Sequence, residues 1–310
     1  MQTTNAVLLV RPANFARASE TVGDNSFQEA VAAEPFDAIN ARALREFDRF
    51  VELLQQAGVA VTVVDDTPRP VKPDAVFPNN WFSTHTDGTL VVYPTYWPQR
   101  RLERRQEIID RLAEHYAIRN RLDLTDWETH DRFLESTGCL LLDRNNRIAY
   151  ACLSQRCTAE AVRAWCERMA YQPITFRAFD ARGNAVYHTN VMMALGTRHA
   201  VVCLPAISDQ GERARVRESL LLTGYTLVEL TLKQIDRFAG NLLEVRTPEG
   251  PLWVMSTAAH RALSAKQRTT LLSVPDMRIL HTDLSTIERY GGGSARCMLG
   301  EVFLPLRELA

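Results

Sequence analysis

The sequence predicts an α/β fold in which a unit of one β-hairpin and one helix recurs about five times around a common centre. Three observations support this prediction: a hairpin pattern recurs along the chain, its copies begin roughly 50 residues apart, and amphipathic helical segments lie between them. Such recurrence is typical of a radial array rather than of separate domains. Because the copies share little sequence, an α+β domain with unrelated hairpins stays open as an alternative.

Each predicted hairpin consists of an apolar run, a polar turn and a second apolar run. The turns contain residues that favour tight connections, including Asp87-Gly88, Asn145-Asn146 and Glu249-Gly250. The opening apolar segment, residues 6–12, is a candidate to complete the last hairpin. The predicted hairpins are residues 76–94, 138–154, 190–204, 241–256 and 297–304.

Apolar residues at helical spacing lie between the hairpins. In the first such segment Phe47, Val51 and Leu54 share one face, and Gly58 is suited to end the helix. The last segment opens with residues 264–267 (SAKQ), which have the spacing of a capping box. The predicted helices are residues 38–57, 100–116, 159–169, 209–222 and 264–273.

The composition is that of an ordinary soluble globular protein. The 310 residues are 46% hydrophobic and 24% charged, with a formal net charge of −1. Such a small net charge provides no field to recruit nucleic acid or an anionic membrane, so neither partner is predicted. The one basic cluster, within residues 100–105, has helical spacing and is interpreted as a solvated helix face.

The cysteines and the N-terminus indicate a cytoplasmic protein. Residues 1–12 lack the charged and apolar regions of a signal peptide, and no apolar run approaches the length of a membrane span. Six cysteines without a Cys-x-x-Cys pair indicate free thiols in a reducing compartment. Without a His-x-x-x-His motif or a Cys/His cluster, no metal site is predicted. Core packing is the expectation for Cys139, Cys152, Cys157, Cys166 and Cys203.

A polar or reactive residue stands at or just before the first strand of each predicted hairpin. If the five units surround one axis, these positions converge on it. A thiol, an imidazole and a carboxylate would then share one pocket, which is the set that a cysteine-based acyl or amidino transfer requires. The residues are Asn79, Asn80, Glu135, His188, Asn190, Asn241 and Cys297.

Cys297 is the candidate nucleophile. It follows a glycine-rich stretch, residues 291–296, whose N–H groups can form an anion-binding turn, and Arg296 adds positive charge; both would lower the thiol pKa. His188 lies between apolar residues and is the best candidate for a general acid and base. Glu135 precedes a strongly apolar strand, where an acidic residue costs stability unless it is paired or used. The alternatives are a buried cysteine after a flexible turn, a core histidine and a surface carboxylate.

Four motifs, in order along the whole chain, resemble those of the guanidine-modifying superfamily, also called the amidinotransferase-like or pentein superfamily. Residues 73–81 (PDAVFPNNW) are similar to the dimethylarginine dimethylaminohydrolase segment P-D-x-V-F-x-E-D, and residues 134–138 (LESTG) take the place of L-[ED]-G-G-D. Residues 188–190 (HTN) resemble H-x-D, and residues 291–298 (GGGSARCM) resemble G-G-x-x-C. Their occurrence together, at the starts of successive repeats, makes the resemblance specific.

The resemblance implies a five-bladed α/β propeller, formed by residues 1–310 as a single pentein domain with the site on its axis. It implies a hydrolase of non-peptide C–N bonds that uses Cys297 as nucleophile, His188 as acid and base, and Glu135 as the orienting carboxylate. Neither a cofactor nor a metal is implied, and the expected partner is a small amino-acid substrate.

The chain departs from the guanidinium-binding members, which place carboxylates where it has Asn79, Asn80 and Asn190. A guanidinium has only donors and favours carboxylates, whereas a neutral ureido group has both an acceptor and donors, which an amide matches. The F-P-N-N-W segment looks closest to that of the citrulline-utilisation hydrolases. The departures therefore predict citrulline as substrate, contacted by these three asparagines and by Asp74.

The resulting hypothesis is hydrolysis of citrulline to ornithine, ammonia and carbon dioxide. The Cys297 thiolate attacks the ureido carbon, and His188 protonates the leaving amine and then assists water. Arginine deimination, dimethylarginine hydrolysis and amidino transfer stay open within this class, and an inactive amino-acid-binding module stays open outside it. Arg177, Arg182 and Arg237 are unranked candidates for binding the substrate carboxylate, and a homodimer is one option for the oligomeric state.

Overall fold

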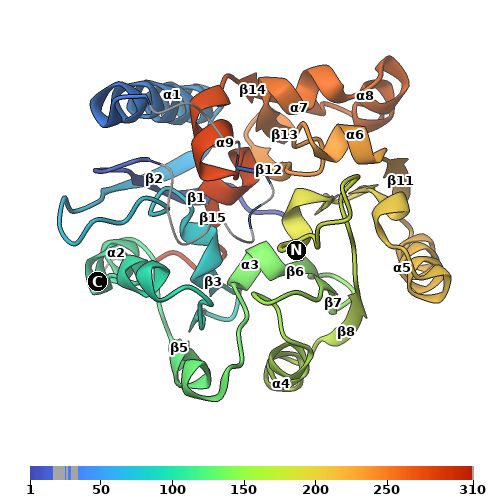
Figure 1. Ribbon diagram of the computed structural model, residues 1–310, viewed down its shortest axis with the longest axis horizontal. Helices are drawn as coiled ribbons and strands as arrows, with labels where there is room; N and C mark the ends of the chain where they lie inside the picture. Colours follow the sequence, from blue (N-terminus) through green and yellow to red (C-terminus); the bar gives the residue numbers. More distant parts are fainter. Residues whose placement is uncertain (17–24, 26, 29–33, 309–310) are drawn as a thin grey trace.

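A computed structural model describes residues 1–16, 25, 27–28 and 34–308, and these residues contain five three-stranded sheets. Figure 1 shows the sheets grouped around a common centre, with the long helices on the outside. In each sheet two strands form the antiparallel pair expected from the sequence, and a third strand runs parallel to the middle one. The predicted five-bladed α/β propeller is therefore confirmed.

The first strand of each hairpin faces the centre, where β6 contacts β9, β9 contacts β12, and β15 contacts β3. The opening segment completes the last hairpin as expected, since Val7 pairs with Glu301 and Leu8 with Gly300. The inner strands are β3 (Phe82–Thr84), β6 (Leu140–Asp143), β9 (Met193–Leu195), β12 (Leu243–Thr247) and β15 (Gly300–Glu301). The middle strands are β4 (Thr89–Val92), β7 (Ile148–Cys152), β10 (His199–Val202), β13 (Gly250–Ser256) and β1 (Ala6–Arg11).

The hairpin pattern alone does not predict the third strand of each sheet. These strands lie at the outer edge, and β2 contains no buried residue, so it lacks a clear apolar alternation. Parallel pairing requires a crossover connection, which the intervening helix supplies. The third strands are β2 (Ala60–Asp65), β5 (Asn120–Asp123), β8 (Gln172–Phe176), β11 (Thr226–Glu229) and β14 (Arg278–Thr282).

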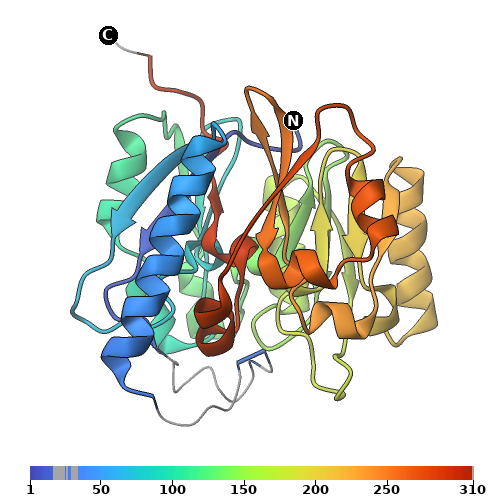
Figure 2. The ribbon, with the colours of Figure 1, turned by 90° about the horizontal axis from the view of Figure 1, so that it is seen from above.

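Most helices lie where the sequence predicts them, and Figure 2 shows α1 and α5 on opposite sides of the strands. The helix α4 spans the predicted segment, and Gly58 follows the end of α1 with a φ of +84°. The capping box of Ser264 and Gln267 is present at the start of α8. The helices are α1 (Phe36–Gln56), α2 (Gln106–Ala113), α4 (Ala159–Met169), α5 (Gln210–Leu222), α6 (Leu232–Ile235), α7 (Thr257–Ala262), α8 (Ala265–Leu271) and α9 (Ser285–Gly291), with 3-10 turns η4 (Thr125–His130) and η6 (Leu204–Ala206).

The single helix predicted over residues 100–116 is wrong. Two segments stand there, η3 (Pro98–Glu103) and α2, separated at Arg104, whose ψ of 72° is not helical. Arg100 does not lie on a solvated face: it is 4% exposed, and its guanidinium donates to both oxygens of Glu103 at 2.8 and 2.9 Å. A buried ion pair can have the same helical spacing as a surface pair, so the sequence pattern does not distinguish them.

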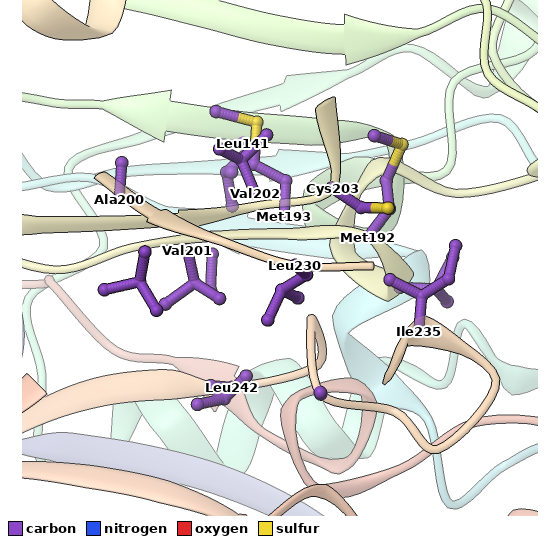
Figure 3. Packing of buried hydrophobic residues seen from close by; sticks show 14 of the residues in the cluster. Leu141, Met192, Met193, Ala200, Val201, Val202, Cys203, Leu230, Ile235 and Leu242 are labelled. Atoms are coloured by element: carbon purple, nitrogen blue, oxygen red, sulfur yellow. The ribbon is translucent and has the colours of Figure 1, made fainter. Parts of the chain in front are cut away.

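Buried apolar side chains fill the space between neighbouring sheets. Figure 3 shows one such cluster, in which Met193 lies with Leu141 on one side of strands β9 and β10 and Val201 points to the other side, toward Leu242. The core location expected for the five cysteines other than Cys297 is confirmed, because all five are buried. In the described part of the chain, no helix is long and apolar enough to cross a membrane.

Candidate active site

Short helical turns, rather than strands, carry the polar residues to the centre of the propeller. Side chains in these turns hydrogen-bond across to the preceding blade: Thr137 donates to the carbonyl of Asn79 at 3.2 Å. Thr189 likewise donates to the carbonyl of Cys139 at 2.5 Å. These bonds fix the turns relative to one another. The turns are η2 (Pro78–Asn80), α3 (Ser136–Cys139), η5 (Thr189–Val191) and η7 (Ala295–Met298).

A small cavity lies at this centre. Four of the residues predicted for the site line it: Cys297, His188, Asp74 and Asn80. The other three predicted residues, Glu135, Asn79 and Asn190, are buried and do not line it. Among the described residues, the cavity is also lined by Asn25, Phe77, Arg100, Arg156, Tyr187, Gly291 and Gly293.

Cys297 lies in η7 and is 4% exposed. Its Sγ accepts a hydrogen bond from Nδ2 of Asn241 at 3.2 Å and lies 3.8 Å from Oδ1 of Asn190. Burial raises the pKa of the thiol, and the Ser294 backbone, Asn241 and Arg296 offset that effect only in part. The lowered pKa expected from the glycine-rich turn and Arg296 is therefore wrong, because burial outweighs both.

The glycine-rich stretch before Cys297 makes room for an aromatic ring. A Cβ at Gly291 or Gly293 would stand 2.8 Å from the ring of Phe77, closer than real Cβ contacts. Gly292 between them has a φ of +65°, a conformation that favours glycine. The stretch therefore lets the backbone before the nucleophile approach the cavity wall closely.

His188 is 2% exposed and forms a hydrogen bond between its Nε2 and Oε2 of Glu135 at 2.7 Å. Burial alone would lower the pKa of the imidazole, but the neighbouring Cys139 and Glu135 outweigh burial and raise it. The Cys139 thiol itself has a pKa well above its usual value and donates to the carbonyl of Arg156. We therefore attribute the raised pKa of His188 to Glu135, which favours the imidazolium form needed by an acid.

Glu135 is fully buried and remains ionised. Its Oε1 accepts from the backbone N–H of Tyr96 at 3.1 Å, and its Oε2 lies 3.7 Å from Arg156 and 3.9 Å from Arg100. Burial alone would raise the pKa of the carboxyl, but Arg156, the hydrogen bond with His188, and Arg100 lower it to about 2. The carboxylate therefore holds the imidazole in one orientation at neutral pH.

Buried amide groups surround the reacting centre. Asn80 accepts from Arg100 at its Oδ1, at 2.9 Å, whereas its Nδ2 has no hydrogen-bond partner among the described residues. The Nδ2 of Asn190 and both polar atoms of the Asn79 side chain also lack partners among these residues. A buried polar group left unpaired costs about 1–3 kcal/mol, so Asn80, which lines the cavity, is suited to receive a polar ligand. Gly138 permits this packing, because a Cβ there would stand 2.5 Å from Nδ2 of Asn80.

Two arginines that sequence reasoning did not assign to the site line the cavity. Arg100 and Arg156 are 4% and 1% exposed. The three arginines proposed from the sequence as carboxylate binders do not line this cavity, and the side chain of one of them, Arg182, is 61% exposed. No sequence pattern separates the buried arginines from the surface ones, because both kinds stand in polar stretches. The three are Arg177, Arg182 and Arg237.

The arrangement brings together a thiol, an imidazole paired with a carboxylate, amides and two guanidinium groups. The thiol is able to attack a carbon bound to nitrogen. The imidazole paired with the carboxylate is able to deliver a proton to the departing nitrogen. The guanidinium groups are suited to bind a carboxylate. Among the residues that the structure describes, no group of three or more His, Cys, Asp or Glu side chains is placed to hold a metal ion.

Comparisons with solved structures show the same fold. The N-terminal domain of ArgZ, an arginine dihydrolase from the ornithine–ammonia cycle in cyanobacteria, is 17% identical, with 97% of this chain and 98% of that chain covered and a TM-score of 0.75. Unliganded AgrE is 18% identical, with 98% of this chain and 40% of the AgrE chain covered and a TM-score of 0.74. The dimethylarginine dimethylaminohydrolase from Pseudomonas aeruginosa, in complex with citrulline, is 15% identical, with coverage of 97% and 100% and a TM-score of 0.65.

No curated protein matches the chain. The chain does match a sequence family over residues 11–304. This family is described as N,N dimethylarginine dimethylhydrolase, eukaryotic. This match spans nearly the whole propeller, from β1 to the segment after β15. The chain therefore belongs to the dimethylarginine dimethylhydrolase family and is a hydrolase of the C–N bonds of guanidino compounds.

Proposed function

We propose that the protein hydrolyses citrulline to ornithine, ammonia and carbon dioxide. The observation that carries the proposal is a buried amide donor in the cavity wall, Nδ2 of Asn80, which lacks a partner among the described residues. A ureido oxygen is an acceptor for such a donor. A guanidinium has no acceptor, so it would leave this donor unpaired.

The charges around the cavity also favour a neutral head group. Three buried carboxylates lie beside Arg100, and each already interacts with a cationic group of the protein. Glu103 accepts two hydrogen bonds from Arg100, Asp74 lies 4.0 Å from Arg100, and Glu135 bonds to His188. A guanidinium substrate would compete with these protein cations for the same carboxylates. A ureido group needs no carboxylate and avoids this competition.

Arg156 is assigned to the α-carboxylate of citrulline. It lines the cavity, and a guanidinium can bind a carboxylate through two parallel hydrogen bonds. Arg100 also lines the cavity and adds positive charge there.

The reaction proceeds in two displacements. The Sγ of Cys297 attacks the ureido carbon as the thiolate, the imidazolium of His188 gives its proton to the departing nitrogen, and the C–N bond breaks. Ornithine leaves, and a carbamoyl group remains bound to sulfur. Water then attacks this group, with the neutral imidazole of His188 accepting a proton from it, and the C–S bond breaks to restore the thiolate and the imidazolium. The released carbamate decomposes to ammonia and carbon dioxide. If the terminal nitrogen departs first, ammonia leaves before ornithine, and the overall balance is unchanged.

The ligands of two similar structures are compatible with this substrate class. The Pseudomonas aeruginosa enzyme was solved with citrulline, and ArgZ is an arginine dihydrolase solved with its substrate. Both are distant relatives, so the choice of citrulline for this chain depends on the amides and charges of its own cavity.

Steady-state assays with citrulline, arginine and dimethylarginine test the proposal. We expect ornithine and ammonia from citrulline, with a higher kcat/KM than for either guanidino compound. Faster consumption of arginine or dimethylarginine would overturn the proposed substrate. No turnover of any of the three, together with a Cys297 thiol that resists iodoacetamide, would favour the inactive amino-acid-binding module.

A further inference from the structure

Asn241 has no role in the proposed reaction, although it stands in its repeat where other repeats carry their site residues. It lies just before the inner strand β12, as Asn190 lies just before β9 and Cys297 just before β15. Its side chain is fully buried. A buried amide at this position is costly unless its donors and its acceptor are all used.

The side chain of Asn241 uses both ends to join neighbouring blades. Its Nδ2 donates to the carbonyl of Asn190 at 2.8 Å and to Sγ of Cys297 at 3.2 Å. Its Oδ1 accepts from the backbone N–H of Arg296 at 3.0 Å. One amide therefore holds a carbonyl of η5, the N–H just before the nucleophile, and the nucleophilic sulfur itself.

We propose that Asn241 is a positioning residue for Cys297, which fixes the sulfur at the cavity wall and stabilises the thiolate as it forms. The inference rests on the proposed function, because it takes Cys297 as the nucleophile. The sulfur packs in an apolar cluster, where burial disfavours charge. A hydrogen bond from an amide N–H is stronger to the thiolate than to the thiol, so it opposes that effect of burial.

Asparagine fits this position better than aspartate, although the two have the same shape. The amide accepts from the Arg296 N–H and donates to Cys297 and Asn190 at the same time. A carboxylate would keep the acceptor but lose both donors, and it would place negative charge beside the sulfur. Asn241→Asp therefore removes the proposed interaction while keeping the bond to the backbone.

The test compares Asn241→Asp and Asn241→Ala with a matched control, Gln2→Glu. Gln2 is also a buried amide that bridges two backbone groups, because it donates to the carbonyl of Leu142 at 2.9 Å and accepts from the N–H of Arg144 at 2.8 Å. It does not line the cavity of Cys297. In each full-length protein the rate of iodoacetamide modification of the Cys297 peptide is followed by mass spectrometry against pH, and kcat and KM are measured with citrulline.

We expect both Asn241 variants to move the modification profile to higher pH by about one pH unit and to lower kcat about tenfold, with KM changed less than about threefold. Gln2→Glu should leave the modification profile, kcat and KM unchanged. Wild-type profiles in both Asn241 variants would overturn the proposal, and so would an equal change in Gln2→Glu. If Asn241→Ala unfolds in a thermal melt, Asn241→Asp, which keeps the bond to Arg296, decides the result. Modification needs no turnover, so a shifted profile without citrulline hydrolysis would support the role of Asn241 and count only against the substrate.

Discussion

Nε2 of His188 lies 2.7 Å from Oε2 of Glu135, although the two residues are 53 positions apart in the chain. The contact joins η5 to the segment just before α3, so two neighbouring blades each supply one half of the pair. Both side chains are almost completely buried, and each shifts the pKa of the other toward its charged form. The protonation states of this pair determine the expected dependence of stability and activity on pH.

The first prediction concerns stability in Glu135→Gln. The pKa of Glu135 is about 2 in the folded protein, whereas an unfolded glutamate titrates near about 4.3. Because the folded-state pKa is lowered, this stabilisation is present above about pH 4.3 and is lost as the pH falls toward 2. We expect the variant to be roughly 3 kcal/mol less stable at neutral pH, with a difference that shrinks below about pH 4.3. Urea unfolding of both proteins at several pH values measures this difference in the free energy of unfolding. A difference that does not depend on pH would contradict the prediction.

The second prediction concerns the alkaline limb of the pH–rate profile. The pKa of His188 is raised, so its imidazolium form is present below the folded-state pKa and is lost as the pH rises through it. We expect kcat/KM to fall with that loss, at a pH above the ordinary histidine value of about 6.5. Glu135→Gln removes the group that raises the pKa, so the fall should move to lower pH. An unmoved alkaline limb in this variant would argue that another group titrates there.

The third prediction concerns the head group and Asn80→Asp. The Oδ1 of Asn80 accepts from Arg100, a contact that aspartate keeps, whereas its Nδ2 is the proposed donor to the ureido oxygen. We expect kcat/KM for citrulline to fall about 10- to 100-fold, with arginine binding weakened less or strengthened. Steady-state kinetics with citrulline and inhibition by arginine measure the two effects, and Asn120→Asp on the exposed strand β5 is the control. Arginine binding that is weakened more than citrulline use would count against the ureido argument.

The fourth prediction concerns the substrate carboxylate. Arg156→Gln should raise the KM for citrulline about 10- to 100-fold, because a charge-assisted pair is lost. It should have little effect on citrullinamide, which lacks the carboxylate charge. Arg182→Gln, at an exposed arginine that does not line the cavity, is the matched control for both substrates. The same loss with citrulline and citrullinamide would exclude carboxylate binding by Arg156.

Much of the fold could be predicted because its repeats leave a local pattern. Each hairpin combines two short apolar runs with a polar turn, and the segment before β15 carries Cys297 in the same position as other repeats carry their polar residues. The outer strands leave no such pattern. Strand β2, for example, contains no buried residue. It pairs with β1, from which the whole of α1 separates it in the sequence. Such long-range parallel pairing is not visible in local periodicity.

The site could be predicted only in part, because burial depends on tertiary partners. The repeat position indicated Cys297, His188 and Asn80, which line one cavity, and their catalytic and binding roles stay predictions until the variants are measured. Arg100 has the spacing of a surface helix residue, and its burial is explained by its bonds to Glu103 and Asn80, the second of which is a tertiary contact that the pattern does not show. The thiol pKa was mispredicted for the same reason, because no local signal reveals how deeply the sulfur is packed.

The central claim is that Cys297 forms a covalent bond to the ureido carbon of citrulline. The most direct measurement mixes the protein with citrulline labelled at that carbon, quenches the reaction in acid at increasing times, and maps the peptides by mass spectrometry. We predict a labelled adduct on the Cys297 peptide that appears before product and then decays to the free thiol, and no adduct in Cys297→Ser. A label on another residue, or ornithine release by Cys297→Ser at the wild-type rate, would contradict the account.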